Sequence, residues 1–176
     1  EKLFYYTTTG WMMWNWLVSA LASEATVILY DGSPFYPTST ALFDLVDQTG
    51  VTLFGVSAKY IDACAKDGIS PKSTHNLDSV RTICSTGSTL AVEGFDYVYQ
   101  EIKNDVHLQS MSGGTDLCGC LVAGDPTGPV HRGEIQKPAL GVKIEILSES
   151  GEELRHGDQG ELVCSNAFPS MPLSFL

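Results

Sequence analysis

The chain has 176 residues, of which 43% are hydrophobic and 18% charged, a composition typical of a folded globular protein rather than a disordered one. Its formal net charge of −11 argues against a nucleic-acid partner, because phosphate contacts require clustered lysine and arginine side chains. The longest apolar stretch, residues 11–22, is too short to cross a bilayer, so no membrane partner is predicted.

Strand-like and helix-like segments alternate along the chain as far as Asp116. The predicted strands are 3–9, 25–30, 51–56, 80–85 and 106–111, and the predicted helices are 11–21, 40–48, 58–66 and 92–102. The helix at 11–21 is apolar almost all round, which predicts burial on more than one side. Because strands alternate with helices, we expect an α/β fold with a mainly parallel sheet and crossover helices.

The later part of the chain has a different character. Residues 124–129 are rich in glycine and proline and predict a loop, and 142–147 and 160–164 predict two strands joined through a turn at 150–152. We expect a small antiparallel β region here, and divide the chain into an α/β portion (1–123) and a β-rich portion (124–176). The chain starts at Glu1 without an initiator methionine and ends in a loop, so we expect it to be an internal piece of a longer protein.

Cysteine and histidine usage points away from metal and nucleophile chemistry. The five cysteines, scattered among apolar residues, predict reduced, mostly buried thiols of an intracellular protein: Cys64, Cys84, Cys118, Cys120 and Cys164. No further Cys or His pair completes four ligands around Cys118 and Cys120. His75 and His156 are predicted as solvated loop residues, and no Ser-His-Asp or Cys-His arrangement supports nucleophilic catalysis.

Glycine and hydroxyl residues follow two successive predicted strands. Thr86-Gly87-Ser88-Thr89 follows the strand at 80–85, and the strand at 106–111 is expected to break at Ser112-Gly113-Gly114, before Thr115-Asp116. Ligands bind beyond the carboxyl ends of parallel strands, and a hydroxyl with a carboxylate suits a phosphate and its Mg²⁺. Two plainer interpretations stay open: an ordinary turn at 112–115, and a helix N-cap at 86–88, which is compatible with ligand binding.

A third hydroxyl-rich segment, Thr7-Thr8-Thr9-Gly10, suggests a phosphate loop at first sight. It lacks the lysine of the Walker pattern at the required distance. We therefore interpret it as the end of a strand that delivers Trp11 to the wall of a pocket.

Five motifs occur in order along the chain: residues 5–16 (YYTTTGWMMWNW), 29–34 (LYDGSP), 85–88 (STGS), 112–116 (SGGTD) and 160–164 (GELVC). Together they resemble the acetoacetyl-CoA synthetase family, a branch of the acyl-adenylate-forming (AMP-binding) superfamily. The resemblance covers the whole chain and implies part of the large N-terminal domain of such an enzyme. It implies ATP-dependent activation of acetoacetate through an acyl-adenylate, transfer to coenzyme A, a need for Mg²⁺ and a place in the cytosol.

The resemblance also assigns roles to individual residues. The resemblance implies that the adenosine part of the ligand is lined by Gly87, Ser88, Thr89, Ser110, Met111, Ser112 and Gly114. The acyl group is expected to face Trp11, Met12, Met13, Thr86 and Gly113. Thr115 would hydrogen-bond the α-phosphate, and Asp116, where the superfamily usually has Glu, would bind Mg²⁺; these two are the catalytic candidates. Phe35 is implied to lie near the path of coenzyme A.

Gly113 departs from the residue that related enzymes carry at this position, and the difference bears on which acid can bind. Related acetyl-CoA synthetases place a tryptophan at this position, so a glycine is expected to open room for a longer acid such as acetoacetate. The alternative is that Gly113 only satisfies a turn, which would leave the chain length of the acid undetermined.

Several parts of the superfamily's machinery are not in this sequence. Its lysine-bearing phosphate loop is expected before Glu1. Its ribose-binding Asp, the following Arg and the domain with the catalytic Lys are expected after Leu176. Without those charges the chain alone is expected not to complete the reaction. Two other functions stay open: a CoA ligase for another short or branched acid, and a truncated, non-catalytic binding module.

Overall fold

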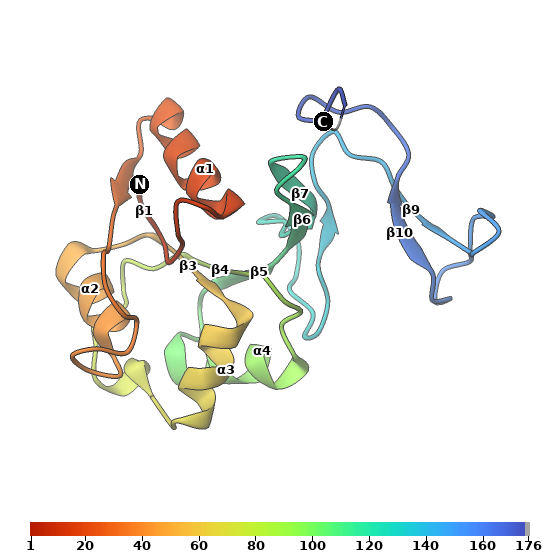
Figure 1. Ribbon diagram of the computed structural model, residues 1–176. Helices are drawn as coiled ribbons and strands as arrows, with labels where there is room; N and C mark the ends of the chain where they lie inside the picture. The colour runs from red at the N-terminus through yellow and green to blue at the C-terminus, as the bar shows by residue number, and fades with distance from the viewer. Residues whose placement is uncertain (175–176) are drawn as a thin grey trace.

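The computed structural model describes residues 1–174, and their first part forms a five-stranded sheet (Figure 1). The strand order is β2-β1-β3-β4-β5, and every neighbouring pair runs parallel. The strands are β1 (Lys2–Tyr5), β2 (Thr26–Ile28), β3 (Leu53–Ser57), β4 (Thr82–Thr86) and β5 (His107–Ser110). The predicted α/β fold with a parallel sheet is therefore confirmed.

Helices connect these strands, as predicted. Within the described residues the α-helices are α1 (Met12–Ser19), α2 (Ala41–Thr49), α3 (Ala58–Lys66) and α4 (Val92–Tyr97). Short helical segments are η1 (Ala20–Ser23), η2 (Pro71–Ser73) and the π-helical η3 (Val98–Ile102). Figure 1 shows α1 on one face of the sheet and α2, α3 and α4 on the other. No helix among residues 1–174 is long and apolar enough to cross a membrane.

The N-cap of α4 is Ala91, with no side-chain cap hydrogen bond. The interpretation of 86–88 as a helix cap is therefore wrong. The physical reason is that an irregular segment separates the end of β4 from the helix, so these polar residues stay at the edge of the sheet.

Two apolar cores lie on opposite faces of the sheet, because successive side chains of a strand point to opposite sides. Phe4 and Phe54 stack with ring centroids 5.8 Å apart in the larger core, under α2, α3 and α4. Tyr5, one residue after Phe4 on β1, and Cys84, one residue after the buried Ile83 on β4, belong to the smaller core under α1. The pleat of the strands thus decides which residues can reach the α1 side.

The helix α1 buries one side only, contrary to the prediction. Met12, Met13 and Leu17 are buried, whereas Val18 is 38% exposed, and Leu21 in the following η1 is 58% exposed. An apolar composition shows that a helix can be buried, but the number of layers packed on it decides how much is buried. In the described structure only the sheet side of α1 is covered.

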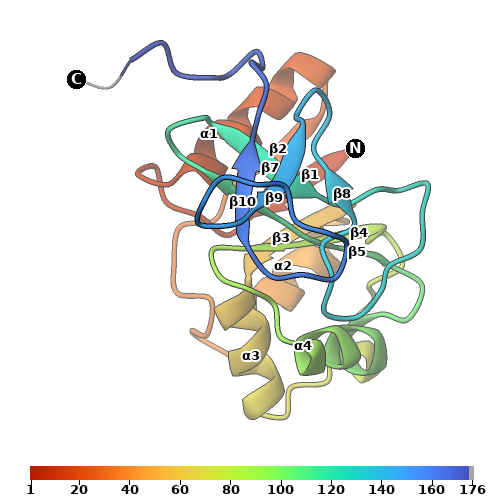
Figure 2. The same cartoon turned by 90° about the vertical axis from the view of Figure 1, so that its right-hand side faces the viewer.

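The antiparallel part begins earlier than predicted. The strands β6 (Ser112–Gly114), β7 (Gly119–Ala123) and β8 (Lys137–Pro138) form one sheet, and β9 (Ile144–Leu147) and β10 (Glu161–Cys164) form another. Figure 2 views the molecule from this side, with β9 and β10 nearest the viewer. The predicted antiparallel region and the loop at 124–129 are confirmed. The change of pairing lies between β5 and β6, and the division of domains at 123 stays a prediction.

The strand β5 ends at Ser110, so the predicted break before Ser112 is confirmed, but the plain turn considered for 112–115 is wrong for residues 112–114. They form β6, which pairs with β7 with a register shift between Ser112 and Gly113. Pairing with a strand that follows later in the chain compensates for the missing side chains, which local propensity does not reveal.

His75 is not the solvated residue that was predicted. Its side chain is only 8% exposed, its Nε2 lies 2.9 Å from Asp44 Oδ1, and its Nδ1 lies 2.7 Å from Thr74 Oγ1. His156 is exposed, as predicted. The five cysteines are free thiols, but only Cys64 and Cys84 are buried.

Candidate functional site

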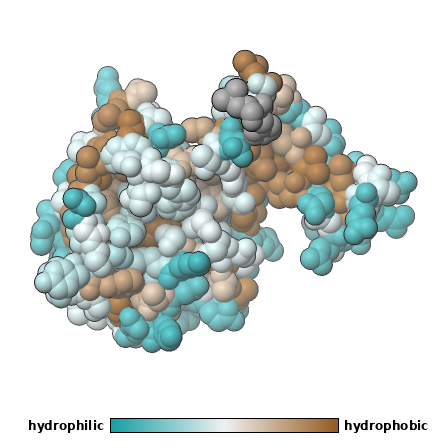
Figure 3. Space-filling model, viewed as in Figure 1, coloured by the Kyte–Doolittle hydropathy of each residue, from teal (hydrophilic) through white to brown (hydrophobic). Residues whose placement is uncertain are grey.

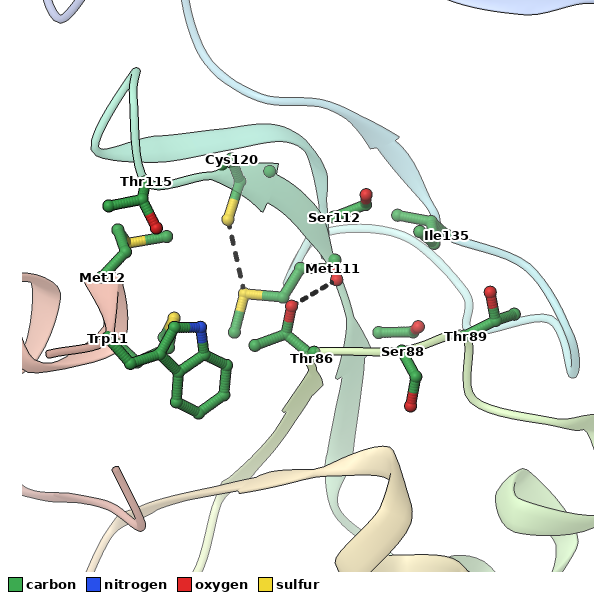
Figure 4. A pocket seen from close by; sticks show the side chains of 15 residues that line it. Trp11, Met12, Thr86, Ser88, Thr89, Met111, Ser112, Thr115, Cys120 and Ile135 are labelled. Carbon is green, nitrogen blue, oxygen red and sulfur yellow. Dashed lines mark hydrogen bonds between the residues drawn. The ribbon is translucent and has the colours of Figure 1, made fainter. Parts of the chain in front are cut away.

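The carboxyl ends of β4 and β5 open into a cavity of about 330 Å³ (Figure 4). This is the edge of a parallel sheet at which ligands are expected. The cavity is lined by all the residues predicted to face the nucleotide or the acyl group: Trp11, Met12, Met13, Thr86, Gly87, Ser88, Thr89, Ser110, Met111, Ser112, Gly113, Gly114 and Thr115. Three segments that are distant in sequence therefore meet around one space.

Two further residues line the same cavity and were not predicted from the sequence, Cys120 and Ile135. Cys120 lies on β7 directly opposite Gly113. Ile135 precedes β8 and reaches the cavity from a long loop, where Figure 4 shows it near Ser112 and Thr89. Only the antiparallel pairing brings these residues to the site, so no local signal in the sequence could have identified them.

Hydrogen bonds between the ends of β4 and β5 fix the base of the cavity. The Thr86 hydroxyl donates to the Met111 carbonyl oxygen at 2.8 Å, and the Met111 N–H donates to the Ser85 carbonyl oxygen at 3.0 Å. These bonds continue the ladder that pairs Ser85 with Ser110. The two predicted strand ends are thus tied together rather than merely adjacent.

Trp11 is positioned at the cavity by an aromatic contact with Tyr5, and two glycines leave the space that these rings need. Its indole meets the Tyr5 ring edge-on with centroids 6.0 Å apart. The Tyr5 ring crosses Gly55, where a Cβ atom would come within 2.0 Å of that ring. Gly87 has φ +88°, which favours glycine, and a Cβ there would lie 3.3 Å from the Trp11 indole. The segment at 7–10 thus leads Trp11 to the cavity wall, as interpreted.

Thr115 and Asp116 lie in the turn between β6 and β7. The Cys118 N–H donates to the Thr115 carbonyl oxygen at 3.0 Å and closes this turn. Thr115 lines the cavity, whereas Asp116 is exposed and does not. No cluster of three acidic, His or Cys residues that could hold a metal occurs among residues 1–174. A single exposed carboxylate beside the cavity still fits Mg²⁺, which commonly takes one or two carboxylates together with phosphate oxygens and water.

Gly113 has a structural requirement of its own. A Cβ atom at this position would lie 2.1 Å from the Gly119 carbonyl oxygen and 2.6 Å from Cys120 Cα. Any side chain therefore demands a shift of the β7 backbone, because both neighbours belong to the main chain. The glycine permits close pairing of two strands, and its effect on the choice of acid stays a prediction.

The lining divides chemically into two ends. The side chains of Ser88, Thr89 and Ser112 offer hydroxyl groups, and Figure 4 shows them across the cavity from Trp11 and Met12, whose end also carries the Thr115 hydroxyl. None of the residues lining this cavity carries a charge. Such a space suits a ligand with one polar and one apolar end, and it can bind and orient that ligand rather than exchange protons with it.

The thiols beside the cavity are not activated nucleophiles. Burial raises the pKa of the Cys84 thiol to about 12 and also raises the pKa of Cys120. Both thiols therefore stay protonated near neutral pH, and a protonated thiol is a poor nucleophile.

Phe35 lies outside this cavity. Its ring stacks on Tyr60 of α3 with centroids 5.2 Å apart. Its implied position near the path of coenzyme A stays a prediction.

Comparison with known proteins gives consistent matches over the whole chain. The chain is 55% identical over 175 residues to acetoacetyl-coenzyme A synthetase of Rhizobium meliloti (strain 1021), and 47% identical to acetoacetyl-CoA synthetase of Gallus gallus. These matches cover 99% of this chain but only 27% and 26% of the relatives. The chain thus spans about a quarter of the length of the curated relatives it matches.

Solved structures agree with these matches. Acetoacetyl-CoA synthetase from Streptomyces lividans superposes with a TM-score of 0.91 at 44% identity, covering 98% of this chain and 27% of that one. The anthranilate CoA ligase AuaEII in complex with anthranoyl-AMP shares the fold, with a TM-score of 0.67 at 20% identity over 78% of this chain and 25% of its own. The predicted resemblance to acetoacetyl-CoA synthetases is confirmed. The family described as AMP-binding enzyme matches residues 3–171, and the chain belongs to it.

Proposed function

We propose that the protein containing this chain is an ATP-dependent acid–thiol ligase that converts acetoacetate to acetoacetyl-CoA through an acetoacetyl-adenylate, in the cytosol. The observation that carries this proposal is the convergence of the predicted nucleotide and acyl residues around one cavity with a polar and an apolar end. The names of the relatives support acetoacetate as the acid.

In this proposal the adenylate lies across the carboxyl ends of β4 and β5. Ser88, Thr89 and the backbone near Ser112 face the adenosine, and the Thr115 hydroxyl donates to the α-phosphate. Asp116 would hold Mg²⁺, and that ion would neutralise charge on the phosphate oxygens. The main contribution of these residues is to hold the acid and the phosphate next to each other in one cavity. Reactants that are already bound in position lose no further translational freedom when they react, which lowers the barrier.

The acyl end of the proposed site is formed by Trp11, Met12 and Met13. Thioether and indole groups bury apolar surface without competing for hydrogen bonds, so a short acyl chain can lie against them. The carboxylate of the acid would then point toward Thr115, where the new bond to phosphorus forms and pyrophosphate leaves. Coenzyme A displaces AMP in the second step.

Exchange of labelled pyrophosphate into ATP tests the first half-reaction in the full-length protein. We expect exchange to require acetoacetate, and Asp116→Ala to reduce it by about a hundredfold or more, the size typical of a lost electrostatic group. Asp158→Ala, at another exposed carboxylate in a turn, should leave it unchanged. Undiminished exchange by Asp116→Ala would defeat the assignment of Asp116.

A panel of acids in the same assay decides which acid is the substrate. We expect acetoacetate to give the highest kcat/KM, ahead of acetate, butyrate and branched acids. A higher kcat/KM with another acid would replace acetoacetate and keep the ligase. Binding of AMP without exchange for any acid would instead favour a non-catalytic binding module.

A further inference from the structure

One side chain outside the motifs organises the loop that closes the polar end of the cavity. The loop runs from the end of β7 to the start of β8 and has no regular secondary structure of its own beyond turns. Gln136, half-buried at its end, has its amide among the backbone groups of residues 125–129. It neither lines the cavity nor belongs to any of the five motifs.

The Gln136 amide bonds both to the loop and to the parallel sheet. Its Oε1 accepts from the Asp125 N–H at 2.9 Å, and its Nε2 lies 3.0, 3.3 and 3.0 Å from the carbonyl oxygens of Asp125, Gly128 and Pro129. The same Oε1 lies 2.9 Å from His107 Nε2, on the first residue of β5. The Asp125 N–H must face the amide oxygen, so the orientation of the amide is determined, His107 Nε2 must donate to the same oxygen, and the two hydrogens of Nε2 are shared among the three carbonyl oxygens.

His107 completes the connection to the sheet. Because its Nε2 donates to Gln136, its Nδ1 is free to accept from Gln109 Nε2, at 3.2 Å. Gln109 and His107 lie two residues apart on β5, so both hold the loop to one face of that strand. The loop is therefore anchored to the rigid part of the molecule through a chain of three polar side chains.

The neighbour of Gln136 is Ile135, which lines the cavity beside Ser112 and Thr89 (Figure 4). A 36% exposed isoleucine has little packing of its own to hold it there. We propose that Gln136 is a positioning residue, which holds Ile135 as the wall of the adenosine end of the cavity by fixing the 125–136 loop to His107. This rests on the proposed function for the identity of the nucleotide.

The test compares variants of the full-length protein in pyrophosphate exchange. Gln136→Met keeps the approximate size of the side chain and removes the hydrogen bonds of the amide. We expect the KM for ATP to rise about tenfold while kcat changes less than about twofold, the pattern of lost ground-state binding. The matched control is Arg132→Met in the same loop, which removes only a solvent-exposed ion pair to Asp96 and should leave both constants unchanged.

A double-mutant cycle separates positioning from general destabilisation. If Gln136 acts through Ile135, Gln136→Met should add less than about twofold to the KM for ATP once Ile135→Ala is present. Additive effects of the two substitutions, or a Gln136→Met enzyme that behaves like the Arg132→Met control, would overturn the proposal.

Hydrogen exchange gives a readout that does not depend on the activity. Gln136→Met should speed amide exchange in residues 125–137 and leave β1 to β5 as protected as before. Unchanged exchange in that loop would overturn the role of Gln136 even if the protein proves not to be a ligase. Faster loop exchange in a protein without pyrophosphate exchange would refute the proposed function alone and keep Gln136 as the anchor of the loop.

Discussion

The parallel and antiparallel parts of the molecule differ in how well their apolar side chains are covered. The largest fully buried side chains, such as Phe4, Phe54 and Leu108, all come from the part up to Met111. After Met111 no residue of the described chain is buried. The strands β9 and β10 carry Ile146, Leu162 and other apolar residues that are only partly buried, and Figure 3 shows hydrophobic surface there.

This difference shows which part can supply stability and which part supplies the site. A two-stranded antiparallel sheet is marginal by itself in water, whereas five strands covered by helices bury a continuous core. The cavity lies at the junction, with Thr86 and Met111 from the well-packed part and Thr115 and Ile135 from the other. One wall is therefore rigid by packing, and the other depends on hairpin pairing and on side chains such as Gln136.

The largest loss of stability should come from a large-to-small substitution in the core of the parallel part. Phe54→Ala removes a 2% exposed ring that contacts Phe4 and Phe43, and should lower the free energy of unfolding by about 3–5 kcal/mol. Ile146→Ala in β9 should cost less, about 1–2 kcal/mol, because its side chain is only partly covered. Urea unfolding followed by circular dichroism measures both, and equal losses would refute the contrast between the two parts.

A smaller effect is expected where the two parts meet. Gly113→Ala forces a methyl group against the Gly119 carbonyl oxygen, so we expect a loss of about 1–3 kcal/mol and disturbed pairing of β6 with β7. Gly114→Ala is the matched control, since its Cβ would meet only Leu117 at ordinary contact distance, 3.7 Å. It should change stability by less than about 0.5 kcal/mol. Thermal unfolding and amide exchange of residues 112–123 compare the two variants, and similar values would remove the strict requirement for Gly113.

The smallest effect concerns an exposed charge within the well-packed part. A hydrogen bond from His75, and further ones from Thr38 and Thr40, lower the pKa of Asp44 below its ordinary value of 3.8. A lowered folded-state pKa stabilises the protein above the unfolded-state pKa, and this contribution disappears as pH falls through the folded value. Asp44→Asn should therefore cost less than about 1 kcal/mol at pH 7, and the difference should shrink below about pH 3.8. A difference that stays constant down to pH 2 in urea titrations would contradict this account.

Much of the parallel part was predictable because its signals are local. Short apolar runs such as 51–56 and glycine-marked helix ends such as Gly50 identify strands and helices without reference to distant residues. The order of Thr86-Gly87-Ser88 and Thr115-Asp116 after successive strands also predicted one common site, because parallel strands carry their carboxyl ends to the same edge of a sheet. His75 was misjudged since its burial depends on Phe43 and Asp44, which lie about thirty residues away.

The sequence by itself determined the alternating strands and helices, the two polar strand ends and the family, since periodicity and motif order are properties of neighbouring residues. Only the tertiary structure decided that residues 112–114 pair as β6, that Cys120 and Ile135 enter the cavity, and that Gln136 ties its loop to His107. These features depend on antiparallel pairing and on hydrogen bonds between residues far apart in sequence. Such contacts form only once the chain has folded, so no local pattern of residues records them.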